Sequence, residues 1–170
     1  MLSFDIRTLT SQAAQVDGVL LPDDDVWEEG DLRPVAGVHV TGRISPAGAG
    51  RFYFSGRLDG RLETECRRCL AAAAADVSGG MHAVFADVGD VEVDDDPDVY
   101  HLDPHSAALD LRPAVREQWL LGAPAFVECR PDCKGLCPTC GADLNAGPCS
   151  CEPATEHRWD ALRTHRADPS

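Results

Sequence analysis

The chain has 170 residues and a mass of 18.2 kDa, a size typical of one domain with a small appended module, and its 44% hydrophobic content is enough to build a core. Its formal charge of −14 at pH 7 excludes long-range attraction to nucleic acid or anionic membranes, and it favours a basic partner or simple solubility. We see neither the start of a secretory signal nor a run of about 20 apolar residues that would cross a bilayer. We therefore expect a cytoplasmic, acidic protein with no membrane contact.

The N-terminal acidic segment, residues 1–34, gives little indication of regular structure. Its stretch LPDDDVWEEGDL, residues 21–32, has no base, and its spacing suits neither an amphipathic helix nor a clean strand, so we interpret it as a loop or an edge. The pattern changes at residue 35, where VAGVHVTGRI alternates until SPAGAG interrupts it. We predict a strand and a turn there, and we start the sheet core, residues 35–125, at this point.

The stretch RFYFSGRLDGRLETECRRCL, residues 51–70, predicts one long strand. Its apolar residues keep even numbers and its charged residues keep odd numbers over most of its length. A two-residue hairpin at Asp59 and Gly60 would place Leu58 beside Arg61 on one face, so register argues against the usual Asp-Gly turn. We expect a bend at a glycine instead, and a further strand near residues 77–86 that returns antiparallel.

An acidic stretch and one helix come next. Residues 87–103 hold eight acids and no Lys or Arg, which indicates a solvated loop or, alternatively, a mimic of nucleic-acid charge that engages a basic protein. The second interpretation assigns partner binding to Asp94, Asp95 and Asp96. The following LDLRPAVREQWLLGAPAF predicts a helix near residues 111–121 that covers a sheet face.

The fold class that we expect from these elements is α+β. It consists of an antiparallel β-sheet with one covering helix and a C-terminal cysteine-rich zinc module. The module and a short C-terminal helix, in ATEHRWDALRTHRA, would occupy residues 126–170.

Six of the eight cysteines lie within residues 128–151, ECRPDCKGLCPTCGADLNAGPCSC. Because disulfides are rare in the cytosol, clustered cysteines at these short spacings favour metal ligands. The CPTCG knuckle supplies two thiolates, and CSC lies across a loop rich in turn-forming residues, so we expect one four-thiolate zinc site. Its ligands would be Cys137, Cys140, Cys149 and Cys151.

The other cysteines suggest a second, less certain site that joins the end of the long strand to the start of the module. Its ligands would be Cys66, Cys69, Cys129 and Cys133. Spacing alone leaves this partition open, because Cys133 lies four residues before Cys137 and can replace a more distant ligand. The CRRC pair can also be two reduced thiols or a redox pair, although it lacks the strand-helix context of a thioredoxin.

Four sulfurs leave zinc no open position for water, so we expect one or two structural Zn²⁺ and no catalysis at the metal. With both sites filled, eight thiolates and two ions would bring the formal charge to about −18. The sequence contains no phosphate-binding loop, nucleophile elbow or zinc-protease motif, and its carboxylates occur in runs. We therefore nominate no catalytic residue and no small-molecule substrate.

One local surface is basic, although the chain as a whole is acidic. Between residues 33 and 70, seven arginines face three acids, and four of these arginines share the odd-numbered face of the long strand. This arginine face consists of Arg51, Arg57, Arg61 and Arg67. It can hold RNA phosphates, with Tyr53 stacking on a base, or it is a solvated strand face balanced by its own acids.

The order of these motifs resembles the YceD family. The resemblance rests on CRRCL after a long strand, LDLRPAVREQWLL, CRPDCKGLCPTCGADLN, CSC and HRWDAL. It implies a role in the accumulation and processing of large-subunit (23S) ribosomal RNA, and it implies no catalytic activity. By position, the family's paired cysteines correspond to Cys66 and Cys69, and its CKGLCPTCG segment corresponds to Cys133, Cys137 and Cys140. Many members lack some of the later cysteines, which implies a stabilising role for Cys149 and Cys151.

The function that we expect is that of a non-enzymatic factor in ribosome biogenesis. It would bind a large-subunit ribosomal protein or the immature large subunit, with rRNA contact as a further option. The alternative is a zinc-stabilised regulatory module that binds protein or nucleic acid outside the ribosome. An RNA nuclease or a redox enzyme is a third hypothesis.

Overall fold

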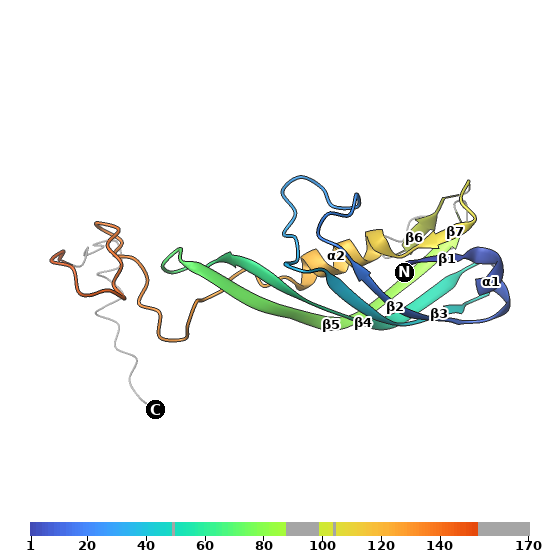
Figure 1. Cartoon of the computed structure of the whole chain (residues 1–170), viewed down its shortest axis with the longest axis horizontal. Helices are drawn as coiled ribbons and strands as arrows, with labels where there is room; N and C mark the ends of the chain where they lie inside the picture. The colour runs from blue at the N-terminus through green and yellow to red at the C-terminus, as the bar shows by residue number, and fades with distance from the viewer. Residues whose placement is uncertain (49, 88–98, 104, 153–170) are drawn as a thin grey trace, which may run out of the picture.

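The computed structural model describes residues 1–48, 50–87, 99–103 and 105–152, and it has an α+β fold (Figure 1). None of its helices is long and apolar enough to cross a membrane, as far as the described residues go. The elements in chain order are β1 (Ser3–Asp5), α1 (Ile6–Ser11), β2 (Ala14–Leu20), β3 (Val38–Pro46), β4 (Phe52–Glu65), β5 (Ala72–Asp87), β6 (Val99–Leu102), β7 (Ala108–Asp110) and α2 (Arg112–Gly122).

Five strands form the main sheet, in the order β2-β3-β4-β5-β6. Four of them are antiparallel neighbours, and three of these, β3, β4 and β5, correspond to strands that the sequence predicted, but β6 pairs parallel with the end of β5, where Val99 lies opposite Val84. The sheet is therefore mixed, and the prediction of one acidic loop over residues 87–103 is wrong for β6. Apolar contacts explain this strand, because Tyr100 stacks on Phe85 with ring centroids 5.3 Å apart and Leu102 is buried.

The first 34 residues take part in the same architecture. β2 is an edge strand of the main sheet, and β1 pairs with β7 in a second, two-stranded sheet. The side chains of Leu9, Val16 and Leu20 are buried in the main core. The sequence pattern predicted a sheet that begins at residue 35, without β2, so the sheet starts one strand earlier than expected.

The long strand β4 has the predicted form. Its even-numbered apolar side chains are buried and its odd-numbered side chains are exposed. Asp59 pairs with His39 of β3 and with Ser78 of β5, so the strand runs on through Asp59 and Gly60 without a hairpin turn. At Gly56 a Cβ would lie 2.2 Å from the carbonyl oxygen of Thr41, so β3 and β4 approach closely enough to require glycine.

Helix α2 covers one face of the sheet, close to the range predicted from the sequence (Figure 1). Trp119 is fully buried and lies over Gly60, where an added Cβ would come within 2.8 Å of the indole ring. The indole Nε1 of Trp119 donates a hydrogen bond of 2.6 Å to the carbonyl oxygen of Leu32. The helix thus ties the acidic stretch before β3 to the sheet.

Two arginines of α2 also hold this acidic stretch. Arg112 contacts Asp24 and Asp25 at 3.0 and 2.9 Å, and Arg116 contacts Asp31 at 2.6 Å. The hydrogen bond from Arg116 lowers the pKa of Asp31, so the carboxylate form is favoured. The loop expected over residues 21–32 is therefore held to the helix by ion pairs.

The β4–β5 ribbon projects beyond the rest of the sheet and carries the cysteine-rich segment at its far end (Figure 1). The ladder between the two strands extends to Glu65 opposite Ala72, whereas β3 pairs with β4 only as far as Asp59. The outer end of the ribbon therefore has two strands over most of its length, an arrangement that is marginally stable by itself. The attachment of this end to the cysteine-rich segment therefore constrains the position of the ribbon.

We expect Trp119→Ala to lower the free energy of unfolding by about 3–5 kcal/mol, because it removes a fully buried indole and leaves a cavity. The matched control is Leu121→Ala on the same helix, whose side chain is 71% exposed and whose loss should change stability by about 0.5 kcal/mol or less. Urea unfolding followed by circular dichroism measures both values. Equal losses in the two variants would contradict the packing described here.

Candidate metal centres

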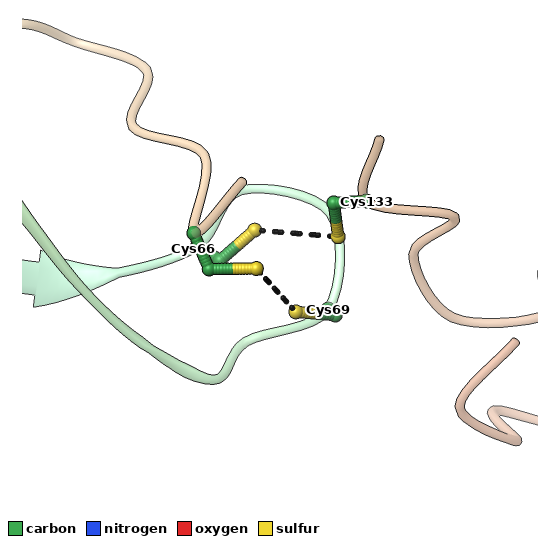
Figure 2. A group of neighbouring side chains, drawn as sticks. Cys66, Cys69 and Cys133 are labelled. Carbon is green, nitrogen blue, oxygen red and sulfur yellow. Dashed lines mark hydrogen bonds between the residues drawn. The ribbon is translucent and has the colours of Figure 1, made fainter. Parts of the chain in front are cut away.

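The first cysteine group joins the turn between β4 and β5 to the segment after α2. Cys66 and Cys69 lie in the turn, and Cys129 and Cys133 come from that later segment. The four sulfur atoms lie within 4.8 Å of one another. Figure 2 shows Cys66, Cys69 and Cys133 around a common centre.

The sulfur distances fit a metal ion and exclude a disulfide. The Sγ atoms of Cys66 and Cys133 are 3.8 Å apart, and those of Cys69 and Cys129 are 3.6 Å apart. Four sulfurs at about 2.3 Å from one tetrahedral ion would be about 3.8 Å from one another. A disulfide needs about 2.0 Å. The donor set therefore fits a tetrahedral thiolate site.

The second group lies entirely within the C-terminal module. Its members are Cys137, Cys140, Cys149 and Cys151, and their sulfurs also lie within 4.8 Å of one another. The structure therefore gathers the same two sets of four cysteines that the sequence analysis suggested. In the part of the chain that the structure describes, these are the only sets of His, Cys, Asp or Glu side chains placed closely enough to hold a metal ion.

Both groups are built on the same backbone turn. In the first turn the amide of Leu70 donates to the carbonyl oxygen of Cys66, at 2.9 Å, and the amide of Cys66 donates to Ala71, at 2.8 Å. The second turn repeats this pattern with the same two distances, from Gly141 to Cys137 and from Cys137 to Ala142. We call these turns knuckle 1, residues 66–71, and knuckle 2, residues 137–142.

Backbone contacts assemble the module on knuckle 1. The amide of Leu136 donates to the carbonyl oxygen of Arg68, and that of Arg67 donates to Val127, both at 2.8 Å. Gly135 has φ of 75° and sits so close to Arg68 that a Cβ would lie 2.8 Å from its carbonyl oxygen. The link between Cys133 and Cys137 is therefore fixed against the end of the ribbon.

Asn145 is a supporting residue that the sequence analysis missed. Its side-chain oxygen accepts a hydrogen bond of 2.8 Å from the amide of Lys134, and its Nδ2 lies 3.7 Å from the sulfur of Cys133. It thereby connects the loop of the second group to a ligand of the first. The turn-forming composition of GADLN signals a turn, but nothing in it identifies this distant contact.

The backbone prepares one thiol in each knuckle for metal binding. Hydrogen bonds from backbone amides lower the pKa of the Cys66 thiol to about 6. The amide of Cys129 has the largest effect, and the amides of Arg68 and Cys69 contribute less. The amides of Cys140 and Thr139 likewise lower the pKa of Cys137 to about 6. Each knuckle therefore presents a thiolate at neutral pH.

At least one thiol in each group has a raised pKa and keeps its proton at neutral pH. Desolvation and the neighbouring thiols raise the pKa of Cys129 to about 12. Hydrogen bonding with Cys140, followed by desolvation, raises the pKa of Cys151 to about 11. A bound cation would have to displace at least these protons.

The arginine face is largely engaged in internal contacts. Arg61 pairs with Asp76 at 2.9 Å, and Arg67 pairs with Glu128 at 3.1 Å while its guanidinium lies 5.1 Å from the ring centroid of Phe126. The other two arginines of this face differ in exposure. Arg51 is partly buried, whereas Arg57 is exposed and has no ion pair among the described residues. The acidic candidates Asp94, Asp95 and Asp96 and the expected C-terminal helix lie outside the described residues.

Comparison with known proteins identifies the family. The family model described as large ribosomal RNA subunit accumulation protein YceD matches residues 54–164. The chain belongs to the YceD family. The matched range contains nearly all of β4, all of β5 and α2, and all eight cysteines.

Curated relatives match over shorter ranges. The chloroplastic large ribosomal RNA subunit accumulation protein YCED homolog 1 of Zea mays is 37% identical over 79 residues, which is 46% of this chain and 27% of the maize protein. Uncharacterized proteins of Mycobacterium bovis and Mycobacterium tuberculosis are 31% identical over 100 residues, which is 58% of this chain and 47% of theirs. The match thus spans half of these relatives or less. No solved structure matches.

We expect zinc affinity to fall with falling pH, by about tenfold or more per pH unit for each site near neutrality, because each group holds at least one thiol that must lose a proton. Competition with a chromophoric chelator at about pH 7.5 and about pH 6.5 measures this slope. An affinity that does not depend on pH would contradict thiolate ligation.

Proposed function

We propose that this YceD-family protein is a non-enzymatic factor for biogenesis of the large ribosomal subunit that supports the accumulation and processing of 23S rRNA. The observation that carries the proposal is the family match, whose description names large ribosomal RNA accumulation. The curated maize relative carries the same description. In this chain the match spans the ribbon and both cysteine groups, the parts that distinguish the molecule from a plain sheet-and-helix fold.

The proposed partner is a large-subunit ribosomal protein or an immature large subunit in the cytoplasm. The formal charge of −14 attracts a basic protein from about one Debye length, roughly 8 Å at physiological salt, and it opposes RNA until contact is close. The projecting ribbon supports the proposal as well, because it carries the module away from the main core. A long projection of this kind can enter a crowded particle.

Each cysteine group, we further propose, holds a structural Zn²⁺. When bound, the ion would supply a cross-link between segments and would leave no coordination position for a substrate, because four thiolates complete a tetrahedral site. The complete set of four thiolate ligands is therefore incompatible with substrate binding at the metal. The residues that would hold the ions are Cys66, Cys69, Cys129 and Cys133 in the first site and Cys137, Cys140, Cys149 and Cys151 in the second.

Of the two charged surfaces, we favour the acidic run of residues 87–103 as the one that recognises a basic ribosomal protein. The engagement of Arg61 and Arg67 in ion pairs supports this choice, because it leaves less free positive charge on the arginine face. Removal of Asp94, Asp95 and Asp96 would therefore slow association.

On a sucrose gradient of cell lysate, we expect the tagged full chain to travel with immature large subunits. Substitution of Asp94, Asp95 and Asp96 by Asn should lower the association rate about tenfold, and ribonuclease should not release the partner protein. The matched control is Arg57→Gln with Arg61→Gln, which should retain binding within about twofold.

The opposite pattern would assign recognition to the arginine face. In that case the glutamine variants should lose binding and flatten its salt dependence by about one unit of log-log slope per lost phosphate contact. Wild-type protein that stays at the top of the gradient would contradict the proposed function and favour a regulatory module outside the ribosome.

Freshly isolated, reduced protein should carry one or two Zn²⁺ per chain, and chelation or Cys140→Ser should loosen residues 126–152 while β3 and the parts of β4 and β5 that pair beside it stay protected. The physical reason is that metal binding and folding of the module are coupled, whereas the sheet has its own apolar core. Elemental analysis and hydrogen exchange measure the two effects. A protein isolated without metal, or a module with unchanged protection, would rule out structural zinc.

A further inference from the structure

The two knuckles differ at one position that has the same backbone geometry in both. Gly141 follows the second cysteine of knuckle 2 with φ of 73°, and Leu70 follows the second cysteine of knuckle 1 with φ of 60°. Glycine adopts this left-handed region without steric cost, whereas a Cβ-bearing residue is strained there. Among the described residues, Leu70 is the only non-glycine residue with positive φ.

Packing inside the molecule does not account for leucine at this position. The Leu70 side chain is 58% exposed. It belongs to neither cluster of buried apolar residues, including the small one formed around Cys66, Ala73, Val127 and Cys133. The amide of Leu70 makes the hydrogen bond to Cys66, and glycine makes the equivalent bond in knuckle 2. The fold therefore requires the backbone hydrogen bond of Leu70, whereas its side chain faces solvent.

An exposed side chain that is kept in a strained conformation points to a contact outside the chain. We propose that Leu70 is an anchor residue that inserts into an apolar recess on a large-subunit ribosomal protein. The position suits this role, because knuckle 1 closes the far end of the projecting ribbon (Figure 1). Two backbone hydrogen bonds, from Leu70 to Cys66 and from Cys66 to Ala71, close the turn, and a metal bound at Cys66 and Cys69 would hold it further, so the leucine is presented on a rigid support.

The chemistry of the Leu70 side chain favours protein over RNA. An aliphatic side chain cannot stack on a base as an aromatic ring does and offers no hydrogen bond to a base edge. The charged side chains of residues 66–71 and 126–152 cancel, since four cations stand against four carboxylates. They are Arg67, Arg68, Arg130 and Lys134 against Glu128, Asp132, Asp143 and Glu152. Two filled thiolate sites would make this end negative, which repels phosphate.

This inference rests on the proposed function, because the partner is a component of the large subunit. The test compares Leu70→Gly with Leu70→Met in the zinc-loaded full chain. The probes are immature large subunits from cells that lack the protein, the RNA-free proteins extracted from those particles, and protein-free 23S rRNA. Leu70→Gly should keep its zinc and melt at the same temperature as wild type or higher, because glycine removes the strain.

Leu70→Gly should nevertheless bind the particles and the extracted proteins about tenfold more weakly or worse, the loss expected when a buried leucine side chain is removed from an interface. Leu70→Met keeps an apolar side chain of similar volume and should bind within about threefold of wild type. In Leu70→Asn, the asparagine tolerates the left-handed conformation but has no apolar side chain. This variant should therefore bind as weakly as the glycine variant.

The possible failures are distinguishable. If wild type binds and Leu70→Gly binds equally well, this inference is wrong and the proposed function stands. If wild type binds none of the probes, both are wrong. A defect confined to protein-free 23S rRNA would overturn the protein recess as the binding site of Leu70. Leu70→Gly that loses zinc while binding unchanged would show that the leucine serves the knuckle alone.

Discussion

The gathering of eight thiols at the end of a two-stranded ribbon is the constraint on which the outer half of this molecule depends. An isolated ribbon is marginally stable, and the segment after α2 has few buried apolar residues of its own, mainly Val127 beside Cys66 and Cys133. Four-thiolate sites would supply the free energy that this small cluster cannot. The contacts of Leu136 and Gly135 with Arg68 then place the second group relative to the first.

We assign different roles to the two acidic stretches of the chain. The acids of residues 21–32 are held by Arg112 and Arg116, so they attach the N-terminal part of the chain to the helix that covers the sheet. The acids of residues 87–103 have no nearby base in the sequence. Composition alone made these two stretches look alike. The pairing with α2 shows that the first stretch serves the fold, and we propose that the second engages a partner.

Sequence could predict features whose cause is local and periodic. The parity of β4 is one such feature, since its apolar side chains recur at every second residue, and the two-residue spacing within each knuckle is another. The edge strand β2 was missed because AQVDGVL mixes polar residues and glycine into its alternation, and β6 was missed because acids surround four β-compatible residues. The contacts of Asn145 and the strain at Leu70 arise from three-dimensional assembly, and no local pattern reports them.

The sequence distance between ligands of the first group has a consequence for the order of folding. Cys66 and Cys133 are 67 positions apart, and β5, β6, β7 and α2 all lie between them. A metal ion there would close a long loop, and the entropic cost of that closure is small only after the sheet and helix have brought the ends together. Tight metal retention would then mark a completely folded chain. During synthesis, the first site would close only after Cys133 has been made and the sheet and helix α2 have formed.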